Sequence, residues 1–459
     1  MNKTTFIKRR NTLRKSVPKG VLLFLGQSHS PRTYLDNPFP FRQSSHVLYY
    51  TGINEPDLAV VMLPDGKEVL FGQPQHPDDI VWHGPLPDLP DYGRLAGIKK
   101  TRDISKLESF LATFRKKKVP IHYPPPFRGE QTLRLATLLG CRPETVGKRA
   151  SRELARAIVE QRSIKGKEEI AEIEQALKVT AKMHLLAMTM ARPGTKEVEI
   201  AGAIQGVALA HGMAQPYSPI VSIRGEVLHN ESYANVLRKK DLLLVDAAAE
   251  SQHFYASDTT RTLPVSGRYL GRQRDIYQIV LDSQLAAIKA ASPKVSNKDL
   301  HLIASRTIAS GLKDMGLMKG NVDDAVAEGA HALFFPHGIG HMLGLDAHDM
   351  EDLGRVVGYP GDAERSNQFG LSFLRLVKKL RPGFVITIEP GIYFVPALID
   401  RWKAEKKHKA FINYSKVVQF QSFGGIRIED DILITKASHR VLGPDIPKEI
   451  AAIEAAMAS

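Results

Sequence analysis

The stretch LLLVDAAAESQHFYASDTTRTLPVSG, residues 242–267, decides the fold of the longer part of the chain. Four consecutive aliphatic residues, 242–245, predict a buried strand that ends at Asp246, and the apolar and Thr-rich residues around Asp258 are typical of a second strand. A hairpin-like connection would bring the two aspartates together. A carboxylate at the end of a buried strand is costly to leave unpaired. The two therefore need a cation or a set of donors, and a metal ion is the simplest candidate.

Three later segments also place acids or imidazoles at a strand end or in a turn. In FFPHGIGHMLGLDAHDM, the glycines between His337 and His341 favour a tight turn over a helix, which excludes the helical His-Glu-His zinc pattern. VITIEPG places Glu389 at the end of a strand. In GGIRIEDDILIT, the alternation of the strand puts Arg427 and Glu429 on one face.

Each of these features is ordinary when taken alone. A lone histidine is more often a satisfied core residue, a strand-end aspartate is more often a cap, and a Glu-Asp-Asp run is more often a solvated edge. Together, four carboxylates beside buried strands and one histidine form an oxygen-rich set that suits manganese and related divalent ions. Four carboxylates exceed the need of one ion and suit two ions roughly 3.5 to 4 Å apart that share bridging carboxylates and a hydroxide.

Length and composition predict a cytoplasmic globular protein of two domains. A chain of 459 residues exceeds one ordinary core. The chain has no apolar run near the roughly 18 residues of a membrane span. The basic start is followed by an apolar run, 21–25, that is too short for a signal peptide.

Cysteine content and charge limit the remaining classes. Cys141 is the only cysteine, which excludes a disulfide framework and a thiolate-rich zinc site. The net charge is +14, but the positive residues are dispersed and are not interleaved with aromatic residues. This pattern favours a solvated surface over nucleic-acid binding.

The pattern along the chain predicts an N-terminal α/β domain, residues 1–163, and a second domain, residues 164–459. Short β-rich runs alternate with helical patterns in the first domain. A long amphipathic helix then starts at Lys167 and stops before Pro193.

The ordered set Asp246, Asp258, His341, Glu389 and Glu429, with its flanking strings, resembles the dinuclear metallopeptidases of the aminopeptidase P and prolidase family. The resemblance covers nearly the whole chain, because PFRQSSHVLYYTGINEPD resembles the amino-terminal domain of that family. It implies an α/β (α+β) protein in which the N-terminal domain precedes a catalytic domain of the pita-bread fold.

The resemblance also implies roles for the five ligands. Asp258 and Glu429 would bridge two divalent ions, Asp246 would complete one site, and His341 with Glu389 would complete the other. Manganese is favoured, with cobalt, iron or zinc as alternatives. A hydroxide between the ions would attack the peptide carbonyl, and Glu389 would shuttle a proton to the leaving nitrogen.

Further residues match positions around the substrate in the family. Direct contact with the peptide and support for the ligands both remain open for most of them. The residues with a predicted catalytic or substrate-binding role are His229, His348, Arg375, Arg427 and Tyr217, and those predicted to support the ligands are His337 and Thr260.

The implied substrate is a peptide with proline in second position, and the implied enzyme is a homodimer. Arg375 matches an arginine that binds the free carboxylate of a dipeptide in prolidases. The long segment between Glu389 and Glu429 also resembles prolidase. We therefore expect an Xaa-Pro dipeptidase, with an Xaa-Pro aminopeptidase acting on longer peptides as the alternative. A pita-bread protein that binds a partner without catalysis is a remote alternative.

Overall fold

The chain folds into two compact units. The computed structural model describes residues 1–74, 78–361 and 363–458. The first unit comprises Met1–Arg162 and Met350–Val357, and the second comprises Ser163–Asp349 and Gly358–Ser459. The first border lies one residue from the predicted one, whereas the grouping of 350–357 with the first unit is not anticipated by the sequence. The domain limits 1–163 and 164–459 stay predictions.

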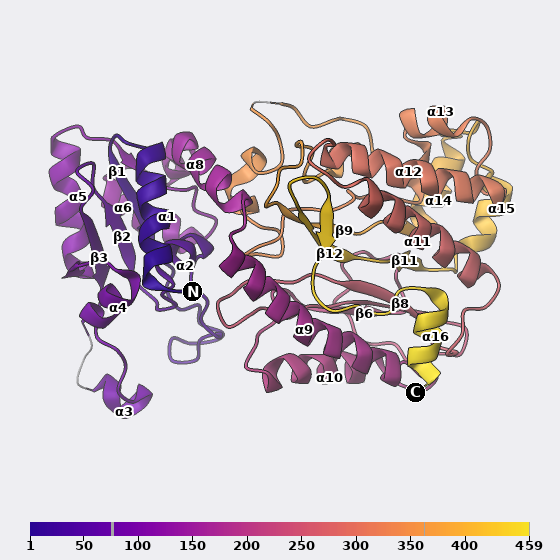
Figure 1. Cartoon of the computed structure of the whole chain (residues 1–459), viewed down its shortest axis with the longest axis horizontal. Helices are drawn as coiled ribbons and strands as arrows, with labels where there is room; N and C mark the ends of the chain where they lie inside the picture. The colour runs from indigo at the N-terminus through magenta and orange to yellow at the C-terminus, as the bar shows by residue number, and fades with distance from the viewer. Residues whose placement is uncertain (75–77, 362, 459) are drawn as a thin grey trace. The chain divides into compact units, whose positions relative to one another are not determined.

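The first unit is built on one five-stranded sheet in the order β4-β3-β2-β1-β5 (Figure 1). β1 pairs antiparallel with β2 and parallel with β5, and β3 pairs antiparallel with β2 and parallel with β4. The strands are β1 Val21–Leu25, β2 Ala59–Met62, β3 Glu68–Gly72, β4 Lys100–Asp103 and β5 Ile121–His122.

Helices surround this sheet, and one face of it forms a core with α5 and α6. The helices are α1 Lys3–Ser16, α2 Ser45–Thr51, α3 Asp79–His83, α4 Leu89–Ala96, α5 Leu107–Lys116, α6 Gly129–Leu139, α7 Pro143–Arg149 and α8 Arg152–Ser163, with 3-10 turns at Ile104–Lys106 and Glu351–Val356. The core uses alternate strand residues, namely Val21, Leu23, Leu25, Ala59, Val61, Val69 and Phe71, packed with Leu107, Leu111, Leu135 and Leu138.

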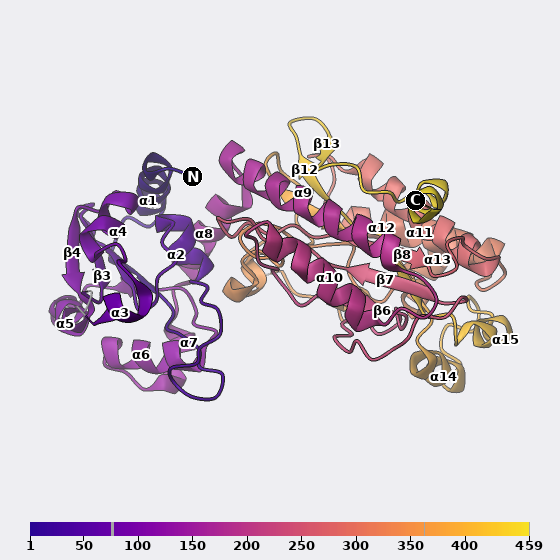
Figure 2. The same ribbon diagram turned by 90° about the horizontal axis from the view of Figure 1, so that it is seen from below.

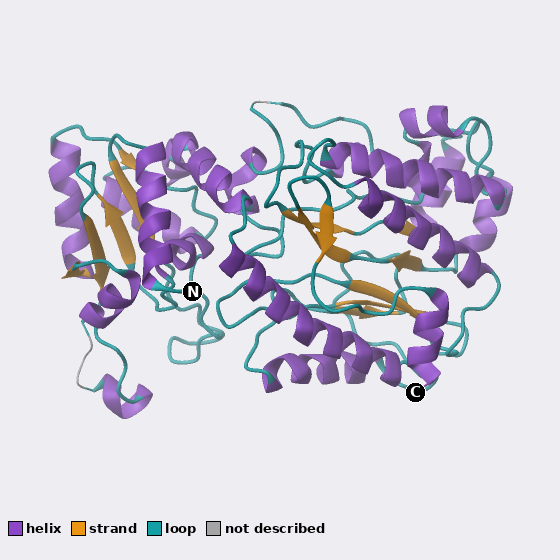
Figure 3. Cartoon of the chain, in the orientation of Figure 1, coloured by secondary structure: helices purple, strands orange, loops and turns teal. Residues whose placement is uncertain are grey.

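The second unit contains three small sheets, with the strand orders β6-β7-β8, β13-β12-β9 and β10-β11. Figure 3 shows these strands at the centre of the unit and the helices outside them. The strands are β6 Ile220–Ser222, β7 Leu242–Asp246, β8 Thr260–Pro264, β9 Val385–Ile388, β10 Gly391–Tyr393, β11 Gly425–Arg427, β12 Asp430–Ile434 and β13 His439–Val441.

Two pairs of long helices cover these strands. In Figures 1 and 2, α9 with α10 lies on one side of β6, β7 and β8, and α11 with α12 lies on the other. The helices are α9 Lys167–Met190, α10 Glu197–Ala210, α11 Arg272–Ala290, α12 Asn297–Asp314, α13 Val322–Ala327, α14 Pro396–Ala404, α15 Tyr414–Val417 and α16 Ile450–Ala458, with 3-10 turns at Ala330–Leu333, Leu371–Phe373 and Val418–Phe420.

The strand predicted from 242–245 and the helix predicted from Lys167 are both confirmed as β7 and α9. β7 pairs antiparallel with β8 in a register that places Asp246 opposite Thr260. The second strand thus begins two residues after Asp258, and the intervening loop carries that aspartate. Among the residues that the structure describes, no helix combines the length and the apolar character needed to cross a membrane.

Candidate functional site

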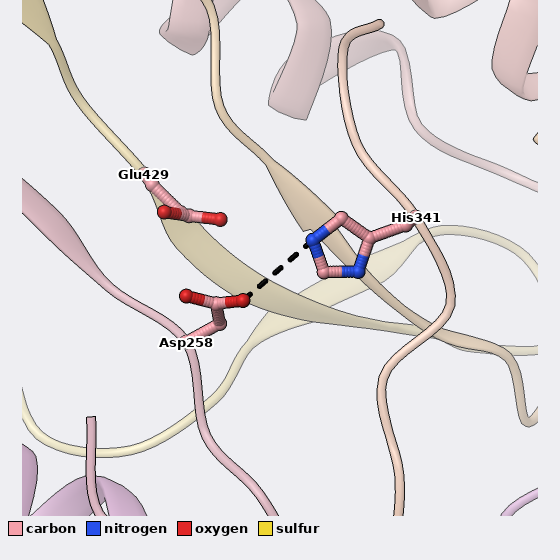
Figure 4. Close-up of side chains that lie close together, drawn as sticks. All are labelled: Asp258, His341 and Glu429. Carbon is pink, nitrogen blue, oxygen red and sulfur yellow. Dashed lines mark ion pairs between the residues drawn. The ribbon is translucent and has the colours of Figure 1, made fainter. Parts of the chain in front are cut away.

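Three of the five predicted ligands form one buried group in the second unit. Ligand atoms of Asp258, His341 and Glu429 all lie within 4.8 Å of one another. Asp258 comes from the loop before β8, His341 from the turn-rich segment before β9, and Glu429 from the junction of β11 and β12. Figure 4 shows the three side chains converging on one point.

Hydrogen bonds between two neighbouring sheets fix the two carboxylates of this group. The Glu429 amide donates to the Thr260 carbonyl (3.1 Å), and the Thr260 hydroxyl donates to Glu429 Oε2 (2.6 Å). The Asp258 amide donates to Asp431 Oδ2 (3.0 Å). Because these bonds join the β8 segment to the β12 segment, the spacing of the two acids depends on how the two sheets are held together.

The His341 imidazole is oriented by the backbone around it. Its amide donates to Thr387 Oγ1, and its Nδ1 lies 3.1 Å from the Met342 carbonyl, to which it can donate a proton. Nε2 then carries the lone pair, and it lies 3.6 Å from Asp258 Oδ2 and 3.4 Å from Glu389 Oε1. A backbone acceptor that fixes one ring nitrogen is the usual way in which a histidine is prepared as a metal ligand.

Glu389 and Asp246, the other two predicted ligands, lie beside this group. Glu389 follows β9, and its amide donates to the Ile339 carbonyl. Asp246 ends β7 and accepts from Arg427 Nη2 at 2.5 Å. The Tyr217 hydroxyl contacts Asp246 Oδ1 (2.8 Å) and Asp258 Oδ1 (2.5 Å). The five residues thus form one connected cluster, and their assignment as ligands stays a prediction.

Three carboxylates of the cluster, those of Asp258, Glu389 and Glu429, have a raised pKa. Burial and then Asp246 raise the pKa of Asp258 well above its usual range, and burial and then Asp258 do the same for Glu429. Burial raises the pKa of Glu389 to about 7, although Arg427 and His348 oppose the shift. Like-charged acids held together in a buried site are stabilised by a bound cation.

The donor set therefore fits divalent ions. Carboxylate oxygens with one imidazole nitrogen suit manganese or another hard or borderline ion better than a soft one. Burial and then His348 lower the pKa of His341 well below its usual range, so its imidazole is neutral at pH 7 and available as a ligand.

The predicted substrate residues differ in how close they lie to this cluster and in how exposed they are. The imidazole of His348 is 4.2 Å from that of His341, centroid to centroid. His229 lies in an exposed turn, and partial desolvation, Arg427 and then Arg375 lower its pKa. Arg375 is exposed, and its charge also lowers the pKa of His341, so its guanidinium acts on the same region.

Arg427 and Thr260 are hydrogen-bonded to predicted ligands, and His337 shares the Tyr393 hydroxyl with Arg427. Arg427 Nε donates to Thr260 Oγ1 (3.1 Å), and its Nη1 donates to the Tyr393 hydroxyl (3.2 Å). His337 Nε2 lies 2.8 Å from that same hydroxyl. Tyr217, predicted to line the substrate, has its hydroxyl between Asp246 and Asp258.

Asp431 and Tyr393 belong to this environment and are missing from the sequence prediction. The Glu-Asp-Asp run, ordinarily a solvated edge, is buried throughout. The period of two could have placed Asp431 on the face of Glu429. For Tyr393 the sequence contains no comparable signal, because its partners come from separate segments.

Comparison with known proteins gives two matching families. Residues 171–436 match metallopeptidase family M24, and residues 6–122 match the aminopeptidase P N-terminal domain. A probable Xaa-Pro aminopeptidase of Emericella nidulans, one of several fungal relatives with that name, is 31% identical over 432 residues, which cover 91% of this chain and 89% of the relative.

The human relative carries the other name, and solved structures share the fold. The Xaa-Pro dipeptidase of Homo sapiens is 30% identical over 453 residues, which cover 95% of this chain and 88% of the relative. A structure of Escherichia coli aminopeptidase P in complex with substrate matches with a TM-score of 0.82 and 28% identity, covering 100% of this chain and 98% of that one.

These matches confirm the predicted architecture, in which an N-terminal α/β domain precedes a pita-bread catalytic domain. The family match spans more than half of the chain, and relatives at 30% identity or more align over nearly all of it. The chain therefore belongs to metallopeptidase family M24, among the members that carry the aminopeptidase P N-terminal domain.

Proposed function

We propose that the chain is a metal-dependent exopeptidase that hydrolyses the Xaa-Pro bond at the amino terminus of short peptides. The observation that carries the proposal is the buried group of Asp258, His341 and Glu429, which has the donor set of a divalent metal site. The names of the relatives, Xaa-Pro aminopeptidase and Xaa-Pro dipeptidase, support the substrate class. As a member of family M24, the chain is a metallopeptidase and thus a hydrolase.

Two divalent ions, with manganese favoured, are the proposed cofactors. Asp258 and Glu429 would be shared between them, Asp246 would complete one site, and His341 with Glu389 would complete the other. When bound, such ions polarise the scissile carbonyl and activate water for attack.

The chain's own residues supply the proton chemistry and the substrate contacts. The pKa of Glu389, about 7, suits a group that takes up and releases a proton near neutral pH. Burial and the adjoining acids raise the pKa of Tyr217, which therefore keeps its proton as a donor to Asp246 and Asp258. His229 and His348 are the proposed peptide contacts.

Recognition of proline explains why a dedicated exopeptidase is required. The bond to a proline nitrogen is a tertiary amide without an N–H, and its geometry is restricted. A protease that binds an extended main chain handles this bond poorly. The site must instead recognise the free amino terminus and the ring.

The length of the preferred peptide separates the two versions of this proposal. The names of the fungal relatives and of the structural neighbour favour the alternative, an aminopeptidase that accepts longer peptides. Arg375 and the long segment after Glu389 favour the dipeptidase. On balance the comparisons support the aminopeptidase better.

Hydrolysis of Ala-Pro and of Ala-Pro-Ala by the manganese-loaded protein tests both versions. Equal or faster cleavage of the tripeptide, unaffected by Arg375→Ala, would establish an aminopeptidase. Preference for the dipeptide that Arg375→Ala abolishes would establish a dipeptidase. Lys379→Ala is the matched control, because it removes an exposed positive charge from the same segment.

Three related points complete the proposal: the protein is a homodimer, it acts in the cytoplasm, and it binds neither membranes nor nucleic acid. Sedimentation of the metal-loaded protein measures the first. Stoichiometric manganese binding without hydrolysis of any proline peptide would contradict the enzyme proposal and indicate a pita-bread binding protein.

A further inference from the structure

The second unit buries an ion pair that plays no part in the proposed reaction. Lys165 Nζ lies 2.7 Å from Asp349 Oδ2, and each side chain is only 1% exposed. Neither residue is a predicted ligand. Desolvation of two charges offsets much of their attraction, so a buried pair of this kind contributes little net stability. Its main effect is to fix the geometry of the segments that it joins.

On the aspartate side, the pair lies at the end of a loop, residues 342–349, that we call the histidine loop. His341 directly precedes this loop, and His348 lies near its end. The Asp349 amide donates to the Met342 carbonyl (3.0 Å), so residues 342–349 form a loop with a closed neck. His341 stands directly before this neck, and His348 directly precedes Asp349. Any movement of Asp349 therefore changes the distance between the two imidazoles, whose centroids are 4.2 Å apart.

The backbone of the loop also packs directly against the ion pair. A Cβ atom at Gly344 would lie 2.4 Å from Asp349 Oδ2 and 2.9 Å from Lys165 Cε. Only glycine allows the backbone to approach the charged groups so closely. The Gly344 carbonyl accepts from the Ala256 amide (2.8 Å), which connects the loop to the segment that carries Asp258.

On the lysine side, the backbone of Lys165 is hydrogen-bonded to a residue just before β9, the strand that ends beside Glu389. The Lys165 amide donates to the Gly383 carbonyl (2.8 Å) just before β9. Gly383 has φ of +92°, and a Cβ there would lie 2.8 Å from Ile164 Cγ2. Lys165 is thus held against the start of β9, whose other end carries Glu389.

Both residues of the pair are close in sequence to a border of the second unit. Ser163 begins the second unit, and Asp349 is the last residue before the segment that belongs to the first unit. The same two stretches of chain are joined again within the first unit, where Arg162 Nη1 contacts His46 Nδ1 (3.0 Å) and His46 Nε2 contacts Asp352 Oδ2 (2.8 Å). The Asp349 end of the loop is therefore held by Lys165, and within the first unit Asp352 is linked through His46 to Arg162.

We infer that Lys165 and Asp349 are positioning residues: they hold the imidazole of His348 at its distance from that of His341, so that His348 can contact the peptide. The inference rests on the proposed function, in which His348 touches substrate. Lys165 acts through Asp349 and touches no reacting atom.

A double-mutant cycle with manganese-loaded protein separates positioning from general stability. Lys165→Met and Asp349→Asn are each measured with Ala-Pro and Ala-Pro-Ala, alone and combined with His348→Ala. We expect each to lower kcat/KM by roughly 10- to 100-fold with unchanged manganese stoichiometry, as for residues that orient a site. In the His348→Ala background the further loss should be less than about 2-fold, because the group being positioned is gone.

Lys448→Met is the matched control. Lys448 is also buried and lies 2.7 Å from an aspartate, Asp430, but it does not contact the histidine loop. Any effect of Lys448→Met should be the same with and without His348. Losses for Lys165→Met that are also equal in both backgrounds, or the absence of any loss, would overturn the inference.

Hydrogen exchange provides a readout that does not depend on activity. Lys165→Met should speed amide exchange across residues 342–349, whereas Lys448→Met should leave that loop unchanged. If Lys165→Met does not fold, Lys165→Met/Asp349→Asn removes both charges and leaves neither stranded. Unchanged exchange in the loop would refute the positioning role. Failure of the wild-type protein to cleave either peptide would refute the proposed function alone.

Discussion

Glu429 and Asp430 are adjacent buried acids with opposite electrostatic environments. For Asp430, burial acts to raise the pKa, but Arg261 and Lys448 outweigh it and lower the pKa to about 2. For Glu429, burial and the neighbouring acids raise the pKa well above its usual range. Positive side chains of the protein thus neutralise Asp430, whereas Glu429 is held close to other acids.

The contrast distinguishes a structural charge from a site prepared for a ligand. Arg261 Nη2 and Lys448 Nζ each donate to Asp430 at 2.7 Å, and Gln284 Nε2 donates at 2.9 Å. Both oxygens of Asp430 therefore accept from donors of the chain, Oδ1 from Arg261 and Oδ2 from Lys448 and Gln284. Glu429 accepts from the neutral Thr260 hydroxyl, and its remaining negative charge faces Asp258 and His341.

Removal of the charge at Asp430 should give the largest effect on stability. Asp430→Asn leaves Arg261 and Lys448 buried without a compensating anion, which typically destabilises a protein by about 3–5 kcal/mol. Urea unfolding of the metal-free variant measures the change. Asp323→Asn, which breaks an exposed pair with Arg306, should change stability by less than about 1 kcal/mol. Equal effects of the two substitutions would contradict the structural role of Asp430.

Glu429→Gln should have the opposite profile, with a large loss of activity and no loss of metal-free stability. Replacing the carboxylate with an amide relieves its repulsion from Asp258, while removing a proposed ligand should lower kcat/KM by more than about 100-fold, the upper range for residues that only support a metal. Metal content and hydrolysis of Ala-Pro-Ala measure the outcome. Glu405→Gln, at an exposed acid, is the control. Full activity of Glu429→Gln would exclude it as a ligand.

The contribution of Glu389 to the stability of the metal-free protein should fall as pH rises. Its folded pKa of about 7 lies above its ordinary value of 4.5, so the folded state binds more protons between these values. Stability from this group is then fully present below pH 4.5 and is lost as pH rises through 7, by at most about 1.4 kcal/mol per pH unit. Urea midpoints for wild type and Glu389→Gln at several pH values test this.

Manganese should remove this loss of stability between pH 4.5 and 7, because it favours the ionised carboxylate in the folded state. Parallel pH profiles for wild type and Glu389→Gln without metal would show that Glu389 has an ordinary pKa.

The sequence predicts the strand before Asp246 because such a strand depends on local pattern, whereas the assignment of the nearby acids as ligands follows from the resemblance and stays a prediction. The aliphatic run before Asp246 and the alternation around Glu429 place both acids beside buried strands, and the structure gathers them. The bonds of Tyr393 to Arg427 and His337 are not predictable in this way, since they join segments far apart in the chain. The return of 350–357 to the first unit has no local signal either, because it depends on the contact of Asp352 with His46.

Thr260→Val should produce the smallest effect. It tests whether the hydrogen bond from the Thr260 hydroxyl is needed to orient the Glu429 carboxylate. The Thr260 hydroxyl donates to Glu429 Oε2 and accepts from Arg427 Nε, so valine of similar shape removes one donor and one acceptor while keeping the strand. We expect a loss of about 10-fold in kcat/KM with metal still bound, at the lower end for residues that orient a ligand. Thr262→Val, one pleat further along β8 and bonded to the Arg427 backbone, is the control that should leave activity within about 2-fold. Equal losses at both positions would mean that the strand register alone, and not the hydroxyl beside Glu429, sets the geometry of the site.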